Sequence, residues 1–417
     1  MSNAFDLAGL HSLAAENLEF FLGWQRSDGL FISRPEQYDG MGQTLWAFGE
    51  HVRRTGDRAF AARVLPAVGR AVDWIRRERE RDPLGLLPSA NLYDNELANG
   101  HIVGDNFWAL IGLQQAAHLA REAGNPVMAE LWSGEARALR SALDGALGPA
   151  TSRTGGWIPP TVESRRGQDW GNAWSAWPLG SYEGERSSGA YSADHPWVRA
   201  TLAHIRGKFR EGIATYANGT LLHGYLGFRV FQTELQQGRQ RNVINGLYDS
   251  LTHTTASHGA FETGVRVYGS RSVDDNMAPH GWFAAEYVSL LRNMLVREEG
   301  ERTLLMSAVS PEWLRPGRRI AVRNAPTIKG PVSFTLRARR GGATLSWDTG
   351  LPAGAALRWP VPEWVKASGG PLSPDGSEYV LDAPSGSIRL NWRLRGPRLS
   401  YAHARSALLR AYARRSG

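Results

Sequence analysis

The chain has 417 residues, of which 42% are hydrophobic and 21% are charged, a composition that excludes wholesale disorder. It contains no cysteine, which excludes disulfides, thiolate nucleophiles and cysteine-ligated zinc from this sequence. The net charge is +8, but the basic residues are almost all arginines scattered along expected helix faces, and no nucleic-acid-binding module is recognisable. We therefore expect no nucleic-acid partner.

No stretch of the sequence is long and apolar enough for a membrane-spanning helix, so we expect no membrane partner. The first ten residues lack the basic segment and the apolar run of a secretory signal peptide. We therefore expect a cytoplasmic protein. The sequence leaves its oligomeric state open.

Two kinds of helical segment alternate over the first 300 residues. The first kind is amphipathic, as in residues 58–79, where apolar residues recur at helical spacing and arginines fill other positions. The second kind is apolar or small on all sides and begins with glycine and aromatic residues, as in residues 104–113, which predicts burial on every side. The other amphipathic segments are residues 10–24, 127–147, 197–209 and 242–254, and the other buried segments begin at Gly42, Gly171, Gly224 and Gly281.

This regular alternation predicts a ring of helices. A repeat in which every second helix is buried closes with the buried helices inside and the amphipathic helices outside. We expect a mainly α protein, an (α/α) toroid of helical hairpins over residues 1–300, in which five hairpins are clear. An open helical solenoid is the alternative, but the segments before the buried helices are long and rich in Trp, Asp, Glu and His, whereas solenoid turns are usually short.

After residue 300 the pattern changes to short alternating runs separated by proline and glycine, which is typical of antiparallel strands. We predict a small C-terminal antiparallel β-sandwich over residues 301–395 and a basic helical tail over residues 396–417. The expected strands are residues 320–323, 332–338, 343–347, 379–381 and 388–392.

Carboxylates and tryptophans gather just before the buried helices. Cleavage of a glycosidic bond needs two carboxyl groups, and sugar recognition uses flat aromatic faces beside polar groups. In a ring these segments converge on one rim, so we expect a carbohydrate site there. An aspartate before a helix is also a common N-cap, so Asp105 taken alone has two readings. The clusters lie at Asp39, Asp94 to Glu96, Asp105 to Trp108, Asp169 to Trp170, Glu262, and Asp274 to Asn276.

Other chemistries fit the sequence less well. It contains no serine-hydrolase elbow, no phosphate-binding glycine loop and no His-Glu-x-x-His motif. The histidines His253, His258 and His280 fall near Asp274 and Asp275, but their spacing matches no metal motif, and ordinary hydrogen-bonding roles are favoured. We therefore expect neither a metal nor a cofactor.

One stretch resembles the six-hairpin glycoside hydrolases, namely glucoamylase-like enzymes and bacterial α-L-rhamnosidases. It runs from Gly259-Ala-Phe-Glu262-Thr to Pro279-His-Gly-Trp282-Phe-Ala-Ala-Glu286-Tyr287. In glucoamylase-type enzymes a loop glutamate near the end of the toroid is the general base, and the next helix carries a similar Trp-x-x-x-Glu-Tyr pattern. The resemblance implies that Glu262 is the general base.

A second stretch is similar to the loop in which glucoamylase-like enzymes keep their general acid. Residues 85–88 lead through Tyr93-Asp94-Asn95-Glu96 to the buried helix that begins at Gly104. The resemblance implies that Asp94, or its neighbour Glu96, is the general acid.

Together these features predict an inverting glycoside hydrolase that acts on an α-linked oligosaccharide or glycoside. In such an enzyme one carboxyl group protonates the leaving oxygen and the other activates an attacking water. We expect the rings of Trp108 and Trp170 to be partly exposed in the cavity; the alternative is that both are core residues on inner helices. The predicted sugar-binding residues are Asp39, Asp105, Asn106, Trp108, Asp169, Trp170, His258, His280 and Trp282.

Two other functions stay open. Only five hairpins are clear where the family has six, which favours a non-catalytic glycan-binding or truncated fragment of a larger six-hairpin glycosidase; binding without turnover would distinguish it. The other alternative is a toroid lyase or phosphorylase. A lyase needs a Tyr, His and Arg constellation, and a phosphorylase needs an anion site.

Overall fold

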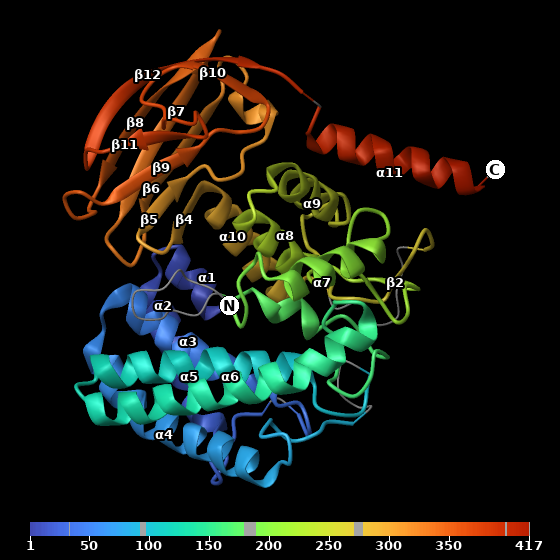
Figure 1. The fold of residues 1–417 in the computed structure, drawn as a ribbon. Helices are drawn as coiled ribbons and strands as arrows, with labels where there is room; N and C mark the ends of the chain where they lie inside the picture. The colour runs from blue at the N-terminus through green and yellow to red at the C-terminus, as the bar shows by residue number, and fades with distance from the viewer. Residues whose placement is uncertain (33, 92–96, 179–188, 271–277, 397, 417) are drawn as a thin grey trace.

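The structure, a computed structural model, describes residues 1–416 except 33, 92–96, 179–188, 271–277 and 397. Helices form most of the chain up to Leu295, strands follow from Val296 to Leu394, and helix α11 (Tyr401–Ser416) ends it. Figure 1 places the N-terminus near the middle of the helical part, with the strands at one end of the molecule. Within the described ranges, no helix has the length and apolar character that crossing a bilayer requires.

The helical part has the predicted inner and outer layers. Every residue of α5 from Val103 to Ala117 is buried, whereas α4 keeps a wet face with exposed side chains such as Arg76. The inner helices are α3 (Asp39–Thr55), α5 (Val103–Glu122), α8 (Gly227–Gln236) and α10 (Gly281–Leu295). The outer helices are α2 (His11–Phe20), α4 (Arg58–Arg81), α6 (Pro126–Thr154), α7 (Pro196–Gly207) and α9 (Gln240–Thr252).

The ring closes through the short N-terminal helix α1 (Ser2–Leu7), which contacts both α3 and α10. The Asp6 carboxylate of α1 lies 3.1 Å from Nδ1 of His51 on α3 and 2.8 Å from Nδ1 of His11 on α2. The sixth inner position, which the sequence did not locate, is therefore held by α1.

The buried segment that begins at Gly171 differs from the prediction. Its described part forms only the 3-10 turn η2 (Asn172–Ser175), which contacts α5, α7 and α8. A run of small and aromatic residues therefore occupies this inner position without a full helix.

The repeated glycines mark places where inner elements cross at backbone contact. A Cβ added to Gly42 on α3 would lie 2.1 Å from the carbonyl carbon of Trp108 on α5. A Cβ added to Gly104 would lie 2.4 Å from Cα of Gly171. Only glycine allows so close an approach, so the repeat in the sequence reflects the packing of the ring.

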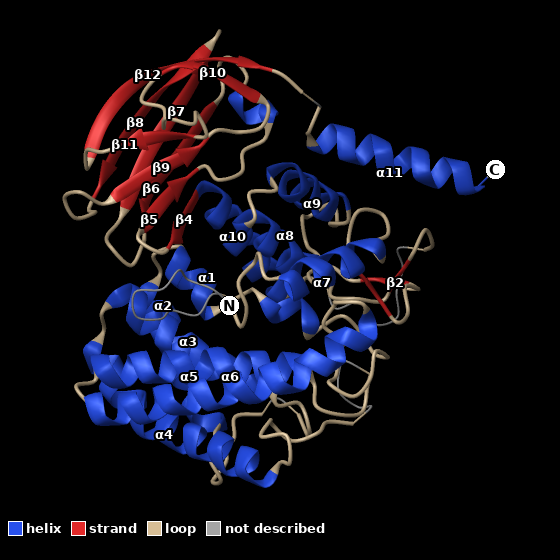
Figure 2. Ribbon diagram, viewed as in Figure 1, coloured by secondary structure: helices blue, strands red, loops and turns tan. Residues whose placement is uncertain are grey.

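The strands that follow α10 form two sheets, as predicted (Figure 2). Trp359 and Trp392, from different sheets, pack edge to face with ring centroids 5.8 Å apart. The five-stranded sheet, in spatial order, is β10 (Val365–Gly369), β12 (Ser385–Leu394), β8 (Gly342–Thr349), β7 (Val332–Arg339) and β6 (Arg319–Ala325). The four-stranded sheet is β11 (Glu378–Leu381), β9 (Ala356–Pro360), β5 (Arg302–Leu305) and β4 (Val296–Glu299).

Pairing in these sheets is antiparallel except between β5 and β9, which are parallel. The five strands expected from the sequence coincide with β6, β7, β8, β11 and β12. The four others were not predicted, because short segments such as Val296–Glu299 carry charged residues and show little alternation.

A third, small sheet lies in the helical part and joins segments that are distant in sequence. It consists of β1 (Thr215–Tyr216), β2 (Leu221–Leu222) and β3 (Val265–Arg266). Ile213, Leu222, Phe261 and Val265 form a separate small hydrophobic cluster beside it. This sheet fixes the backbone directly after residue 262.

Candidate active site

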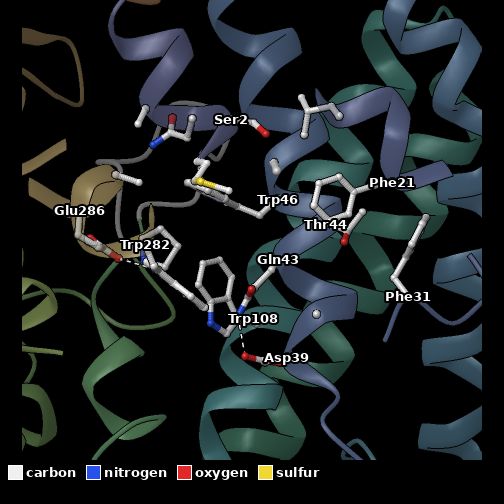
Figure 3. A pocket seen from close by; sticks show the side chains of 18 of the residues that line it. Ser2, Phe21, Phe31, Asp39, Gln43, Thr44, Trp46, Trp108, Trp282 and Glu286 are labelled. Carbon is white, nitrogen blue, oxygen red and sulfur yellow. Dashed lines mark hydrogen bonds between the residues drawn. The ribbon is translucent and has the colours of Figure 1, made fainter. Parts of the chain in front are cut away.

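A cavity of about 630 Å³ lies inside the helical ring. This volume lies within the range typical of pockets that hold drug-sized ligands. Figure 3 shows labelled side chains converging on it from α1, α3, α5 and α10. Its aromatic character is marked, since seven tryptophans line it: Trp24, Trp46, Trp108, Trp170, Trp174, Trp177 and Trp282.

Among the described residues, three carboxyl side chains line this cavity: those of Asp39, Glu262 and Glu286. Asp39 is in the first turn of α3, where its carboxylate accepts a 2.6 Å hydrogen bond from Nε2 of Gln43. Glu286 is on α10, and Glu262 is in the segment between α9 and β3. The ring thus brings together carboxyls from three separate parts of the chain.

Glu262 is held from both its backbone and its side chain. Its carbonyl oxygen accepts a 2.7 Å hydrogen bond from the backbone nitrogen of Gly224, at the start of the fourth buried segment. Its carboxylate accepts a 3.3 Å hydrogen bond from the Tyr225 hydroxyl and lies 3.7 Å from Nε2 of His280. The side chain keeps 20% exposure, so it has an oriented carboxylate with access for a small molecule.

His280 caps the N-terminus of α10, where its Nδ1 accepts a hydrogen bond from the backbone nitrogen of Phe283. Its ring stacks on that of Tyr225, with centroids 5.1 Å apart and planes at 12°. Burial lowers the pKa of His280, an effect that the nearby Glu262 charge opposes. The imidazole beside the Glu262 carboxylate is therefore neutral near pH 7.

Glu286 has a different environment. It is buried, and its Oε1 accepts a 3.3 Å hydrogen bond from the indole nitrogen of Trp282. Burial raises the pKa of Glu286, against the opposing effects of the Arg229 charge and the Trp282 hydrogen bond. A carboxyl with a raised pKa retains its proton more readily, a property that general acids need.

The two glutamates are joined by a pair of stacked rings. Trp282, which donates to Glu286, stacks on Tyr225 with centroids 5.1 Å apart and planes at 11°. Tyr225 in turn donates to Glu262. Movement of either ring would therefore disturb both carboxyls.

A fully buried arginine, Arg229 of α8, supports this aromatic wall. Its guanidinium carbon lies 3.5 Å from the ring centroid of Trp174 and 4.8 Å from that of Trp170. Cation–π contacts of this kind are strongest when water is excluded. Arg229 is not among the residues predicted from the sequence, although a single arginine within the apolar segment 225–231 is a signal for a buried charge.

Five predicted site residues line the cavity: Asp39, Trp108, Trp170, Glu262 and Trp282. The expectation that Trp108 and Trp170 are partly exposed is wrong, because they are only 4% and 6% exposed. Trp108 packs edge to face on Trp174, and Trp170 on Trp282, so neighbouring rings cover most of their surface. They line the cavity and also form part of the core.

Besides His280, which contacts Glu262, four other predicted residues lie outside this lining. Asp105 is buried behind it, in a narrow cleft with Trp108. Asn106 holds the preceding loop, since its side chain accepts from the Leu87 nitrogen and donates to the Ile102 carbonyl. His258 is exposed.

The fourth, Asp169, is paired with Lys208 and accepts a 2.8 Å hydrogen bond from Asn172. Burial tends to raise the pKa of Asp169, but His204, Lys208 and Asn172 outweigh it and lower the pKa. Its carboxylate is therefore committed to neighbouring side chains.

The predicted acids Asp94 and Glu96 lie outside the described residues, as do Asp274 to Asn276. The ends of the segment that holds Asp94 are described. Ala90 and Gly100 exchange two backbone hydrogen bonds, and His101 lies between the carboxylates of Asp82 and Glu163. The Glu163 hydrogen bond is the main reason that the pKa of His101 is raised, which favours a charged imidazole between two carboxylates.

The described residues contain no group of three or more histidine, aspartate or glutamate side chains arranged to hold a metal ion. The histidines considered from the sequence have other partners there. His253 Nε2 lies 3.0 Å from the Glu211 carbonyl oxygen, and His280 faces Glu262.

Comparison with solved structures shows what this fold is similar to. The α-L-rhamnosidase from Dictyoglumus thermophilum aligns with a TM-score of 0.58 and 12% identity over 94% of this chain and 45% of its own. A bacterial glucoamylase complexed with acarbose aligns with a TM-score of 0.50 and 13% identity over 70% of this chain and 47% of its own. A glycosidase variant aligns with a TM-score of 0.53 and 15% identity over 69% of this chain and 84% of its own.

These likenesses show that the chain has the six-hairpin toroid fold of these glycosidases, with a β part after the ring. The chain spans less than half the length of the rhamnosidase and of the glucoamylase. The sequence matches no protein-family model and no curated protein.

Proposed function

We propose that this protein is a glycoside hydrolase that uses two carboxyl groups to cleave a glycosidic bond. The observation that carries the proposal is the partly open Glu262 carboxylate, held by Tyr225 in a tryptophan-lined cavity at the centre of the ring. Aromatic walls with a few oriented polar groups suit a sugar, which has both apolar faces and hydroxyls. The glycosidase fold supports the same assignment.

In this proposal Glu262 is the general base. Its carboxylate takes a proton from a water molecule, which attacks the anomeric carbon. Tyr225 and the neutral imidazole of His280 orient the carboxylate, and neither adds a positive charge that would weaken it as a base. Because this water attacks from the face opposite the leaving group, the product has the inverted configuration.

The general acid is Asp94 or Glu96, as the sequence resemblance implies, on a segment whose ends are anchored by Ala90, Gly100 and His101. Glu286 is a rival within the described residues, because its raised pKa favours the protonated form that an acid must have. Replacing each of the three by its amide would identify the acid. The acid variant should lose turnover of ordinary glycosides but keep fast turnover of substrates whose leaving group needs no proton.

The substrate we propose is an α-linked oligosaccharide or glycoside. This rests on the glucoamylase–acarbose complex and the α-L-rhamnosidase, whose folds this chain shares. Asp39, Trp108, Trp170 and Trp282 lie where such a ligand would contact the cavity.

The test is a screen of 4-nitrophenyl glycosides, including the α-rhamnoside, the α-glucoside and the β-arabinofuranoside, with the product anomer followed by NMR. We expect one sugar to be released with inversion. Release with retention would instead make Glu262 the nucleophile that attacks the anomeric carbon. Glu262 would then not be the base that activates water.

A second candidate is a non-catalytic glycan-binding fragment of a larger glycosidase. It is favoured by the short turn η2 in place of a full inner helix and by the share of the rhamnosidase that the chain spans. Isothermal titration with maltooligosaccharides and rhamnosides, followed by product analysis, separates the two. Saturable binding without any released sugar across the panel would favour the fragment.

A further inference from the structure

The cavity has two chemically different ends. At one end are Glu262, Glu286 and Trp282, which carry the carboxyls and an indole N–H. The other end is formed largely by Leu18 of α2, Ile32, and the rings of Phe20, Phe21, Trp24 and Phe31, which we name the apolar end. Figure 3 shows Glu286 and Trp282 on one side of the cavity and Phe21 and Phe31 on the opposite side.

The apolar end offers little to a sugar hydroxyl. Of the cavity-lining residues that α2 and the adjoining 3-10 turn η1 (Phe21–Trp24) provide, Asn17 alone is polar. Its amide nitrogen already donates to the Ser2 hydroxyl. Thr44, which lies beside Phe21 and Phe31 in Figure 3, adds one hydroxyl. A sugar placed here would replace few of the hydrogen bonds that it loses to water, which is unfavourable.

Three of the four aromatic rings at this end are strongly exposed, whereas Phe31 is buried. Phe20 is 67% exposed, Trp24 61% and Phe21 40%. The rings of Phe20 and Trp24 lie against each other with centroids 5.9 Å apart. Clustered exposed aromatics at the wall of a cavity gain most when an apolar ligand covers them.

We propose that the apolar end binds an apolar aglycone, the non-sugar group of a glycoside whose sugar occupies the carboxyl-bearing end. This inference rests on the proposed glycosidase function and adds the substrate class: a sugar joined to an aromatic or aliphatic alcohol. The argument for this occupant is continuity, because one cavity of about 630 Å³ includes both ends. A volume suited to a drug-sized ligand accommodates a sugar together with its aglycone.

The reaction is then an ordinary hydrolysis. Water adds its hydroxyl to the anomeric carbon and loses a proton to Glu262, while the bond from that carbon to the aglycone oxygen breaks. The acid gives a proton to this oxygen, and the aglycone leaves as an alcohol or a phenol. The apolar end takes no part in these transfers and acts on binding alone.

The experiment compares the octyl and methyl glycosides of the sugar found in the screen. We expect the wild-type protein to have a KM at least about tenfold lower for the octyl glycoside, since buried methylenes in an apolar pocket give discrimination of this order. In the double variant Phe20→Ala/Trp24→Ala this ratio should fall toward one, because the octyl chain loses the two rings that would cover it. Both rings are mostly exposed, so their removal leaves the core intact.

The matched control is Leu131→Ala on α6, a side chain that is 66% exposed and lies outside the cavity lining. It should leave the ratio unchanged. An octyl-to-methyl ratio that is the same in the wild type and in the double variant would overturn the inference while leaving the hydrolase in place. So would gel filtration showing a wild-type dimer that the double variant breaks, because the rings would then belong to a protein contact.

Binding of 2-naphthol, measured by isothermal titration, separates this inference from the proposed function. If no glycoside is cleaved, but naphthol binds the wild type and the Leu131 control and not the double variant, the hydrolase proposal fails and the apolar site stands. If naphthol binds the double variant as well as the wild type, the apolar end is not the site.

Discussion

Glu262 owes its position to neighbours that are distant in the sequence. The preceding residue, Phe261, is buried in the small cluster beside β2, and its carbonyl oxygen would lie 2.0 Å from a Cβ on Gly224. The side chain is oriented by Tyr225 and lies near His280. Among the described residues, Glu262 forms no ion pair with Arg266, and the contacts of its carboxylate are those expected of an oriented functional group.

We predict that Glu262→Gln lowers the hydrolysis rate about 10²–10⁴-fold, because the amide cannot accept a proton from water. Substrate affinity and melting temperature should change little, since the amide keeps the size and the Tyr225 contact. The rate is measured on the glycoside found in the screen, beside thermal unfolding. Tyr225→Phe is the matched control, which removes the hydrogen bond but keeps the carboxylate, and should cost far less. Full activity of Glu262→Gln with a lowered melting temperature would exclude it as the base.

Helix α11 reaches the segment that carries this glutamate. Glu211, just after α7, accepts hydrogen bonds from the backbone nitrogen of Tyr268 and, at 2.9 Å, from the hydroxyl of Tyr412 on α11. The rings of Tyr268 and Tyr412 lie 5.5 Å apart, and the Arg415 guanidinium lies 3.9 Å from the Tyr268 ring centroid. Since Tyr268 follows β3, the C-terminal helix restrains the far end of the Glu262 segment.

Removal of this restraint through Tyr412→Phe should therefore lower kcat several-fold and leave KM nearly unchanged. One hydrogen bond to a charged group contributes about 1.5–3 kcal/mol, only part of which would be felt at Glu262. Steady-state kinetics on the screened glycoside give the two constants. Tyr401→Phe, on an exposed part of the same helix, is the control and should have no effect. A lower melting temperature with unaltered kcat would make Tyr412 a purely structural residue.

The ring as a whole depends on a six-residue helix. Because α1 is the element that contacts both α3 and α10, the cavity is enclosed on that side by Met1 to Ala4. Asp6 links α1 to α2 and α3 through His11 and His51, and its side chain is only 1% exposed. Loss of this link would remove the buried polar contacts that join α1 to its two neighbours.

We expect Asp6→Ala to destabilise the protein by about 1–3 kcal/mol, since it leaves the buried His51 without this hydrogen-bond partner. Urea unfolding followed by circular dichroism measures the change. Asp73→Ala, an exposed carboxylate on α4, should change stability by about 0.5 kcal/mol or less. Equal stability of the two variants would show that α1 is dispensable for closing the ring.

Much of the architecture follows from local patterns in the sequence. Helical spacing in residues 58–79 predicts the amphipathic α4, and the apolar run after Gly104 predicts the buried α5, because the two faces of a helix repeat every few residues. The alternation in Val332–Arg339 predicts β7 for the same reason. Helix α1 was not predicted, because six residues are too few to show such a period. The tryptophan-rich run after Gly171 was predicted to be a helix, but η2 is a single turn.

The chemistry of the site depended on contacts that no local pattern encodes. A family resemblance in the sequence predicted Glu262 as the general base. The raised pKa of Glu286 was not predictable in this way, because it arises from burial by segments remote from it in the chain. Asp169 has the same local appearance as Asp39, beside an aromatic and before a buried segment, yet Lys208 takes its carboxylate. Periodicity is set by neighbours along the chain, so the sequence by itself determined the ring. Burial and charge pairing depend on which distant segments meet, so only the tertiary structure determined which carboxyls face its cavity.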